Sequence, residues 1–124
     1  MNKVFKWNNA KFKFSIANAD TLERYKKAMR EVSQKIDAMN LKEDDYLTIN
    51  EMKRFCEYID MMFDQIFGEG SAQKMFSGEP DMEQHMKAFY KLINLQEMQQ
   101  KDFAEFCGSF GDTVKNSPQI PKGE

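Results

Sequence analysis

The spacing of the apolar residues changes near residue 20, and this change constrains the fold more than any other feature of the sequence. Over residues 3–16, apolar and polar side chains alternate, as the segment KFKFSI illustrates. Such alternation is typical of a half-buried strand. Farther along the chain, apolar residues instead recur every three or four positions, which is typical of amphipathic helices. A strand pair followed by helices predicts an α+β fold.

The alternating segment predicts a β-hairpin with one aromatic face. Asn8 and Asn9 separate its two halves, and Asn tolerates the left-handed backbone that a tight turn needs. Phe5, Phe12 and Phe14 then lie on one side, and lysines lie on the other. A two-stranded hairpin is marginally stable alone, so we expect its aromatic face to lie on helices or to join a larger sheet.

The helical spacing predicts three long helices and one short turn. The apolar stripes cover about residues 21–39, 46–67 and 81–107, and a helical turn over 72–76 precedes the last helix. We expect a bend or a break near 94–97, where polar residues interrupt the apolar face.

These elements predict one domain followed by a tail. Residues 1–108 are expected to form a β-hairpin packed on a bundle of three to four α-helices. Residues 109–124 are polar, contain proline and show no period, so they are read as a flexible C-terminal tail. A chain of 124 residues is long enough to bury a single core.

Polar residues stand where the first two long helices should begin. Asp20 and Glu23 have the spacing of a capping box at the start of the first helix. The second helix begins near Asp45 or Thr48, and Thr48 has Glu51 three positions later, which is again the spacing of a capping box.

The stretch FGEGSAQK, residues 67–74, has only a superficial likeness to a phosphate-binding loop. Such a loop needs a lysine directly after its last glycine, followed by Ser or Thr, whereas Lys74 lies four residues beyond Gly70. Gly68 is placed to end the second helix in a left-handed conformation, and Ser71 is placed to cap the short turn. The stretch therefore predicts turns and no nucleotide site.

No grouping of catalytic or metal-ligating residues can be recognised in the sequence. His85 is the only histidine, and it lies beside an apolar stripe, so we interpret it as a residue at the edge of the core. Glu43, Asp44 and Asp45 lack the pattern of a calcium-binding loop and are read as a solvated connection. We therefore expect no enzymatic activity, no cofactor and no metal site.

Charge and apolar runs predict which partners the chain lacks. The net charge is −2, which argues against affinity for nucleic acid. The sequence has no apolar run of signal-peptide type and no stretch of about 20 apolar residues, so no membrane segment is expected. Cys56 and Cys107 are isolated, and we interpret them as reduced packing residues of a cytoplasmic protein.

The apolar residues are unusually rich in Phe and Met, with 11 and 10 copies. Met side chains adapt to different neighbours, so these residues either fill the core or form a surface that binds a partner protein. The candidates for contact flank the glycine turn: Met61, Met62, Phe63, Met75, Phe76, Met82 and Met86. Each of them is also a candidate for the core.

Two segments carry a family resemblance over about residues 3–107, namely VFKWNNAKFKFSIANAD and FDQIFGEGSAQKMFSG. Their most specific feature is the turn 66–70 followed by Met75 and Phe76. The chain resembles tail assembly chaperones of siphophages and of prophages in Gram-positive bacteria. The resemblance implies a non-enzymatic protein that binds the tape-measure protein, keeps its long apolar helix from aggregating and recruits tail tube subunits.

Two other classes of function stay open. One is a structural tail or head-completion component that forms a homo-oligomer by adding strands to the hairpin edge. The other is a small phage-encoded inhibitor that binds a protein of the host.

Overall fold

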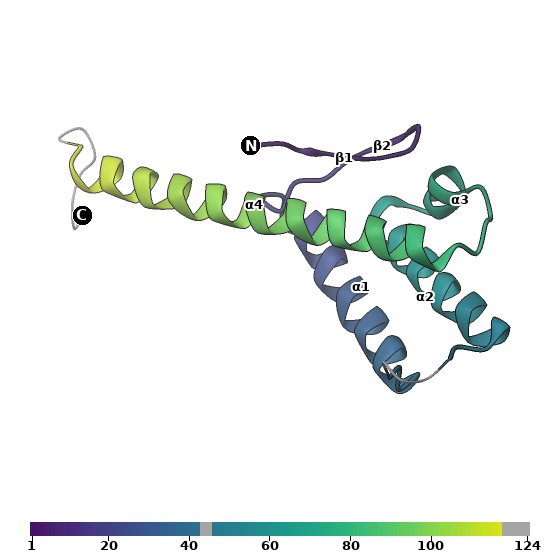
Figure 1. Cartoon of the computed structure of the whole chain (residues 1–124). Coiled ribbons are helices and arrows are strands. Elements are labelled where there is room, and N and C mark those ends of the chain that lie inside the picture. The colour runs from purple at the N-terminus through teal and green to yellow at the C-terminus, as the bar shows by residue number, and fades with distance from the viewer. Residues whose placement is uncertain (43–45, 118–124) are drawn as a thin grey trace.

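A computed structural model describes residues 1–42 and 46–117 of the chain. Its elements are β1 (Val4–Trp7), β2 (Ala10–Lys13), α1 (Ala19–Ala38), α2 (Ile49–Phe67), α3 (Ser71–Phe76) and α4 (Met82–Lys115) (Figure 1). The predicted α+β fold is confirmed, with an N-terminal hairpin and helices after it. The predicted solvated connection 43–45 and residues 118–124 of the predicted tail lie outside the described residues.

The hairpin forms with the predicted turn and the predicted faces. β1 and β2 pair antiparallel, with Phe5 opposite Phe12 and Trp7 opposite Ala10. Asn8 in the turn has φ 53°, the left-handed conformation expected of an Asn there. Phe5 is buried, while the lysines of both strands are exposed. The two strands form a sheet of their own within the described residues, and their aromatic face lies against helices.

Aromatic stacking holds the hairpin on the end of α2. The ring of Phe67 stacks on Phe12 and Phe5, with centroid distances of 4.6 and 5.5 Å. Phe14 meets Phe67 edge-on, and Phe5 also stacks on Phe63 one turn earlier in α2. Offset and edge-on contacts of this kind stabilise beyond the area that they bury. The hairpin therefore covers the C-terminal end of α2.

α1 begins two residues earlier than predicted, and its cap differs. The side chain of Asn18 accepts a hydrogen bond from the backbone N–H of Thr21 at 3.0 Å. The predicted capping box of Asp20 and Glu23 is wrong, because Asp20 already has helical geometry in the first turn. Its carboxylate instead stabilises α1 by interacting with the positive N-terminal end of the helix dipole.

α2 begins with the predicted capping box and lies at the centre of the helices. Thr48 Oγ1 accepts from the backbone N–H of Glu51 at 3.1 Å, and Glu51 Oε1 accepts from that of Thr48 at 3.0 Å. Thr48, and not Asp45, is therefore the N-cap. α2 packs against α1 on one side and against α3 and α4 on the other. Its buried residues are Phe55, Cys56, Ile59, Met62, Phe63 and Ile66.

The glycine stretch forms turns, although its caps differ from the expectation. Gly68 ends α2 at φ 110° and ψ 153°, a positive φ that favours glycine but lies outside the left-handed helical region. Gly70 is the N-cap of α3, and Ser71 is its first helical residue. The predicted Ser71 cap is thus wrong. Asp64 Oδ1 instead accepts from the backbone N–H of Ala72 at 2.9 Å.

α4 is continuous over 34 residues, so the predicted bend or break near 94–97 is wrong. The polar residue Gln99 explains the error, because its side chain is fully buried on the face of α4 that packs against the rest of the protein. Its side-chain amide forms hydrogen bonds with the backbone just after β2. A residue that reads as an interruption of the apolar face is therefore part of the packed face.

The predicted start of the flexible tail is also wrong. The tail was expected to begin at residue 109, but Gly108 and Gly111 both lie inside α4, which continues to Lys115. Figure 1 shows this C-terminal half of α4 extending well beyond the hairpin and the other helices. We call residues 100–115 the arm. The hairpin, α1–α3 and the part of α4 before residue 100 are called the body.

Candidate functional site

An apolar groove lies between α1 and α4, with α2 as its floor. It encloses about 400 Å³, a size within the usual range of binding pockets. We call it the α1–α4 groove. It is lined by Val32, Ser33, Ile36, Asp37, Phe55, Ile59, Met86, Phe89 and Tyr90.

The groove exists because α2 packs against both α1 and α4, whereas α1 and α4 run apart from each other (Figure 1). Phe55 and Ile59 of α2 are buried beneath it. Ile36 of α1 and Met86 and Phe89 of α4 are only partly buried, so apolar surface stays uncovered on both walls. The groove can therefore accept apolar side chains from a partner.

Polar groups of the groove stand at its rim. Ser33 and Asp37 are exposed on α1, and Tyr90 of α4 is 62 % exposed. An apolar floor with few polar groups at the edge is typical of sites that hold an apolar segment in one orientation. Asp37 offers a carboxylate to a basic or hydrogen-bond-donating group of that segment.

Most of the predicted contact residues belong to the core. Met62, Phe63, Met75 and Phe76 are at most 7 % exposed, so they have almost no surface to offer a partner. They pack between α2, α3 and the hairpin. The sequence could not separate them from contact residues because core and contact positions follow the same helical spacing.

The other three predicted contact residues reach the surface in different places. Met61 is 45 % exposed, and its sulfur lies 3.8 Å from Lys35 Nζ. Met82 and Met86 are partly buried in the first turns of α4. Of the predicted residues, only Met86 lines the α1–α4 groove.

The remaining groove residues were missed as contact candidates. Ile36 and Phe89 lie in the predicted apolar stripes and were therefore read as core. Only the angle between α1 and α4 leaves them partly uncovered. Sequence spacing indicates which face of a helix is apolar, but the arrangement of the helices decides how much of that face is covered.

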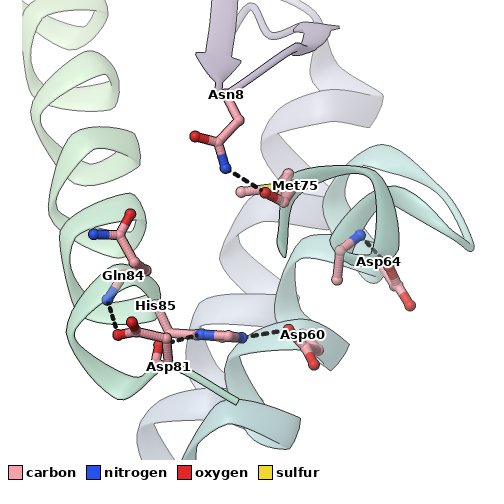
Figure 2. A network of polar contacts seen from close by, with 8 residues as sticks. Asn8, Asp60, Asp64, Met75, Asp81, Gln84 and His85 are labelled. Atoms are coloured by element: carbon pink, nitrogen blue, oxygen red, sulfur yellow. Dashed lines mark hydrogen bonds and ion pairs between the residues drawn. The ribbon is translucent and has the colours of Figure 1, made fainter. Parts of the chain in front are cut away.

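His85 contacts α2 and the start of α4 through polar groups (Figure 2) and α3 through an aromatic ring. Its Nε2 lies 2.8 Å from Asp60 Oδ1, and its Nδ1 lies 2.6 Å from the carbonyl oxygen of Asp81. The ring stacks on Phe76 with centroids 3.8 Å apart. The side chain is fully buried, so its interpretation as an edge residue is wrong.

The partners of His85 determine what its ring can do. The carbonyl oxygen of Asp81 can only accept a hydrogen bond, so Nδ1 donates to it. Nε2 contacts the carboxylate of Asp60, so both ring nitrogens are engaged by groups of the protein. The arrangement therefore holds α2 and the start of α4 together.

The N-terminal end of α3 does not offer a phosphate site. The carboxylate of Asp64 already accepts from the backbone N–H of Ala72 there, and Figure 2 shows Asp64 at this position. A bound anion would meet this negative charge. The interpretation of the glycine stretch as turns agrees with this geometry.

The two cysteines lie in different environments. Cys56 is 2 % exposed, and burial, with a smaller effect from Asp60, Asp81 and Glu57, raises its thiol pKa to about 11. It is therefore a packing residue, as predicted. Cys107 is an exposed free thiol on the arm, so its prediction as a packing residue is wrong. Among residues 1–42 and 46–117, no group of three or more His, Cys, Asp or Glu side chains could hold a metal ion.

The arm carries a second uncovered apolar surface. Phe106 and Phe110 are 70 % and 64 % exposed, and Phe103 is partly exposed. Phe110 was missed because residues 109–124 were expected to be a tail, whereas Phe103 and Phe106 lie in the predicted helix 81–107 and were not among the contact candidates. In the described part of the chain, no helix combines the length and the apolar character needed to cross a membrane.

Comparison with known proteins identifies a family. A family model described as "Family of unknown function (DUF6673)" matches residues 8–119. The matched range includes the groove and the whole arm. Neither a curated protein nor a solved structure matches the chain.

Proposed function

The chain belongs to the DUF6673 family, whose function is unknown, and from this premise we propose that it is a non-enzymatic protein that binds an amphipathic helix of a partner. The α1–α4 groove is the binding site in this proposal. The observation that carries it is the uncovered apolar surface of Ile36, Met86 and Phe89 above a buried floor.

The shape of the groove suits a helix as the bound segment. α1 and α4 form its two walls, so a helix laid between them would pack on α2 as a further member of the bundle. Recognition of this kind places side chains spaced by three, four and seven residues into an apolar groove. The partner segment should therefore carry an apolar stripe of at least two helical turns.

Groove residues also indicate how selective the binding would be. Met86 can adapt its flexible side chain to different neighbours, which suits a partner whose apolar residues vary along its length. Asp37 at the rim favours a Lys or Arg beside the apolar stripe. We infer a partner helix that is apolar on one face and basic at its edge.

The resemblance to tail assembly chaperones provides a candidate for this partner. The tape-measure protein of a siphophage tail contains long apolar helices that need protection before assembly. We propose that this prophage protein binds such a helix in the cytoplasm of its bacterial host and recruits tail tube subunits to it.

The states of the reactive groups support a role without catalysis. Both ring nitrogens of His85 are engaged by groups of the protein, the carbonyl oxygen of Asp81 and the carboxylate of Asp60. The thiol of Cys56 is buried with a raised pKa, so it is not a nucleophile near neutral pH.

A structural tail component that adds strands to the hairpin is the alternative. The outer edge of β1 is already occupied, because Val4 N–H donates to Asn2 Oδ1 at 2.9 Å and Lys6 O accepts from Lys91 Nζ at 2.6 Å. These contacts disfavour strand addition at β1. A small inhibitor could use the same groove, so only the identity of the partner separates it from a chaperone.

Co-expression with the tape-measure protein of the same prophage tests the proposal. We expect a stable complex, and we expect Ser33→Lys to weaken it about tenfold, because the new ammonium group would compete for Asp37 at the rim and repel the basic edge of the partner helix. Gln34→Lys adds the same charge at the next exposed position, which does not line the groove, and serves as the matched control. Both variants change exposed residues, so both should fold.

Two results would contradict the proposal. The first is the absence of any complex between the wild-type chain and the tape-measure protein. The second is equal binding by Ser33→Lys and Gln34→Lys, which would place the site elsewhere. Selective capture of one host protein through the groove would favour the inhibitor.

A further inference from the structure

The apolar face of the arm continues a face that the body buries. His85, Leu92 and Gln99 of α4 are fully buried against the hairpin and α2. Continuing along α4 in steps of three and four residues from Gln99 leads to Phe103, Phe106 and Phe110. The same helical face is therefore covered up to Gln99 and uncovered beyond it.

The arm has little in its own sequence to keep it helical. Gly108 and Gly111 lie in its middle, and glycine is among the residues least favourable inside a helix. Isolated helices of about this length are marginal in water even when their sequences favour helix. A continuous helix here is best explained by packing of the apolar face against a partner.

We propose that this partner is a second copy of the chain, and that the two arms pair antiparallel. Placing Phe103 of one copy opposite Phe110 of the other makes the contact self-complementary, with Phe106 near the two-fold axis. A fully buried Phe contributes about 150–250 Å²; Phe106 and Phe110 still expose 70 % and 64 % of their surface, and Phe103 exposes less. The six Phe side chains together with their neighbours along both arms would bury on the order of 1,000 Å², which is the lower limit of a specific interface.

The length of the arm favours the antiparallel orientation. With Phe103 opposite Phe110, Gln100 of one copy lies opposite Thr113 of the other, so the arms overlap over almost their whole length and only the last two residues of each arm reach the partner's hairpin. A parallel pair would bring the two bodies to the same level. The seam is the face of α4 that carries Phe103, Phe106 and Phe110. At Gln99 the hairpin covers this face through Phe14 and Ile16, so the bodies of two parallel copies would collide.

Charges on the arm also favour pairing of like with like. The charged residues Lys101, Glu105, Asp112 and Lys115 lie on the side of the helix opposite the three Phe residues. Asp102 is the charged residue nearest the seam. Because the seam carries so little charge, it does not favour a partner of opposite charge. Two identical copies also repel each other little across it.

Pairing through the arm is independent of the proposed function. The α1–α4 groove lies on α1, α2 and the first turns of α4, and no arm residue lines it. A dimer would hold two grooves at opposite ends of the paired arms. Loss of pairing should therefore leave the groove of each copy intact.

Sedimentation equilibrium of the full chain tests the pairing. We expect a dimer, and we expect Phe106→Glu to weaken dimerisation at least a hundredfold, because it places two carboxylates beside the two-fold axis. Ala104→Glu adds the same charge on the exposed outer side of the arm and should leave the dimer unchanged. Thermal unfolding of both variants checks that the body is folded. A wild-type monomer at high micromolar concentration would overturn the proposal, as would equal behaviour of the two variants.

Disulfide formation between two populations tests the orientation. One population carries Phe103→Cys and the other Phe110→Cys, both with Cys107→Ser so that no other exposed thiol competes. Mild oxidation of the mixture should link position 103 of one copy to position 110 of the other. Links only within each population, or none in a dimeric mixture, would overturn the antiparallel arrangement.

Discussion

The side chain of Gln99 accepts a hydrogen bond from the backbone N–H of Ile16 at 3.0 Å, across 83 residues of sequence. Its amide nitrogen donates to the carbonyl oxygens of Phe14 and Asn2 at 2.7 and 2.6 Å. One side chain of α4 thereby satisfies three backbone groups where the hairpin ends. This connection fixes the hairpin on α4, close to the point where the arm leaves the body.

Replacing Gln99 by Leu should therefore destabilise the protein strongly. The change introduces an apolar side chain of similar size and leaves the backbone groups of Ile16, Phe14 and Asn2 without this partner. Each buried group that loses its hydrogen bond costs roughly 1–3 kcal/mol, so we expect a loss of about 3 kcal/mol in the free energy of unfolding. Urea unfolding followed by circular dichroism measures it. Gln100→Leu at the neighbouring exposed position is the control, and an equal effect of both changes would contradict this role of Gln99.

His85 and Asp60 should contribute to stability in an energetically coupled way. His85→Phe keeps an aromatic ring against Phe76 but removes both hydrogen bonds, and we expect it to cost about 2 kcal/mol. Asp60 is partly exposed, so Asp60→Ala should cost less. A double-mutant cycle on urea unfolding should give a coupling of about 1 kcal/mol. Glu57→Ala on the exposed side of α2 should show no coupling with His85→Phe, and additive behaviour of Asp60→Ala would contradict the pairing.

Loss of the capping box should weaken the start of α2. Thr48→Ala removes the acceptor for the Glu51 N–H and should lower the free energy of unfolding by about 1 kcal/mol. Thr48→Ser keeps the acceptor and should behave like the wild type. Hydrogen bonds from the Thr48 backbone and side chain lower the pKa of Glu51 below its usual 4.5. This part of the stability is therefore present above that value and lost as the pH falls through the lowered pKa, so the difference between wild type and Thr48→Ala should shrink in acid.

The buried thiol of Cys56 should make the stability fall in alkali. Burial raises its pKa from 9.0 to about 11, so between these values the folded chain keeps a proton that the unfolded chain has lost. The free energy of unfolding should thus decrease as the pH rises from about 9 to 11, by up to about 3 kcal/mol. Burial also raises the pKa of Tyr25, which acts in the same direction. Cys56→Ala should reduce the slope, and an unchanged slope would contradict this cause.

Labelling with a thiol reagent checks the two cysteines separately. In the folded protein near pH 8, Cys107 should react quickly because it is exposed, while Cys56 should react only after unfolding. One rapidly labelled thiol per chain in native buffer, and two in urea, is the expected result. Rapid labelling of both in native buffer would contradict the burial of Cys56.

Local patterns predicted the parts of the fold that depend on near neighbours. Alternation at the N-terminus predicted the hairpin because successive side chains of a strand point to opposite faces. Asn8 predicted its turn, and Thr48 with Glu51 predicted the start of α2. Each of these features is decided by residues within a few positions of one another.

Local patterns failed where distant segments meet. Gln99 reads as a break in an apolar stripe, yet the hairpin supplies backbone partners that make a buried amide favourable there. His85 reads as an edge residue, yet Asp60 of α2 and Phe76 of α3 enclose it. A buried polar side chain is stable only when its hydrogen bonds are met, and those partners are not visible in the local sequence.

The candidate sites were predicted least well. Met86 was predicted as a contact and does line the groove, whereas Met62 and Met75 proved to be core. The sequence determined that the helices would be amphipathic and rich in Phe and Met. Only the tertiary structure decided which part of each apolar face stays uncovered, because the hydrophobic effect favours burial of any apolar face, and the angle between helices sets how much of it is reached.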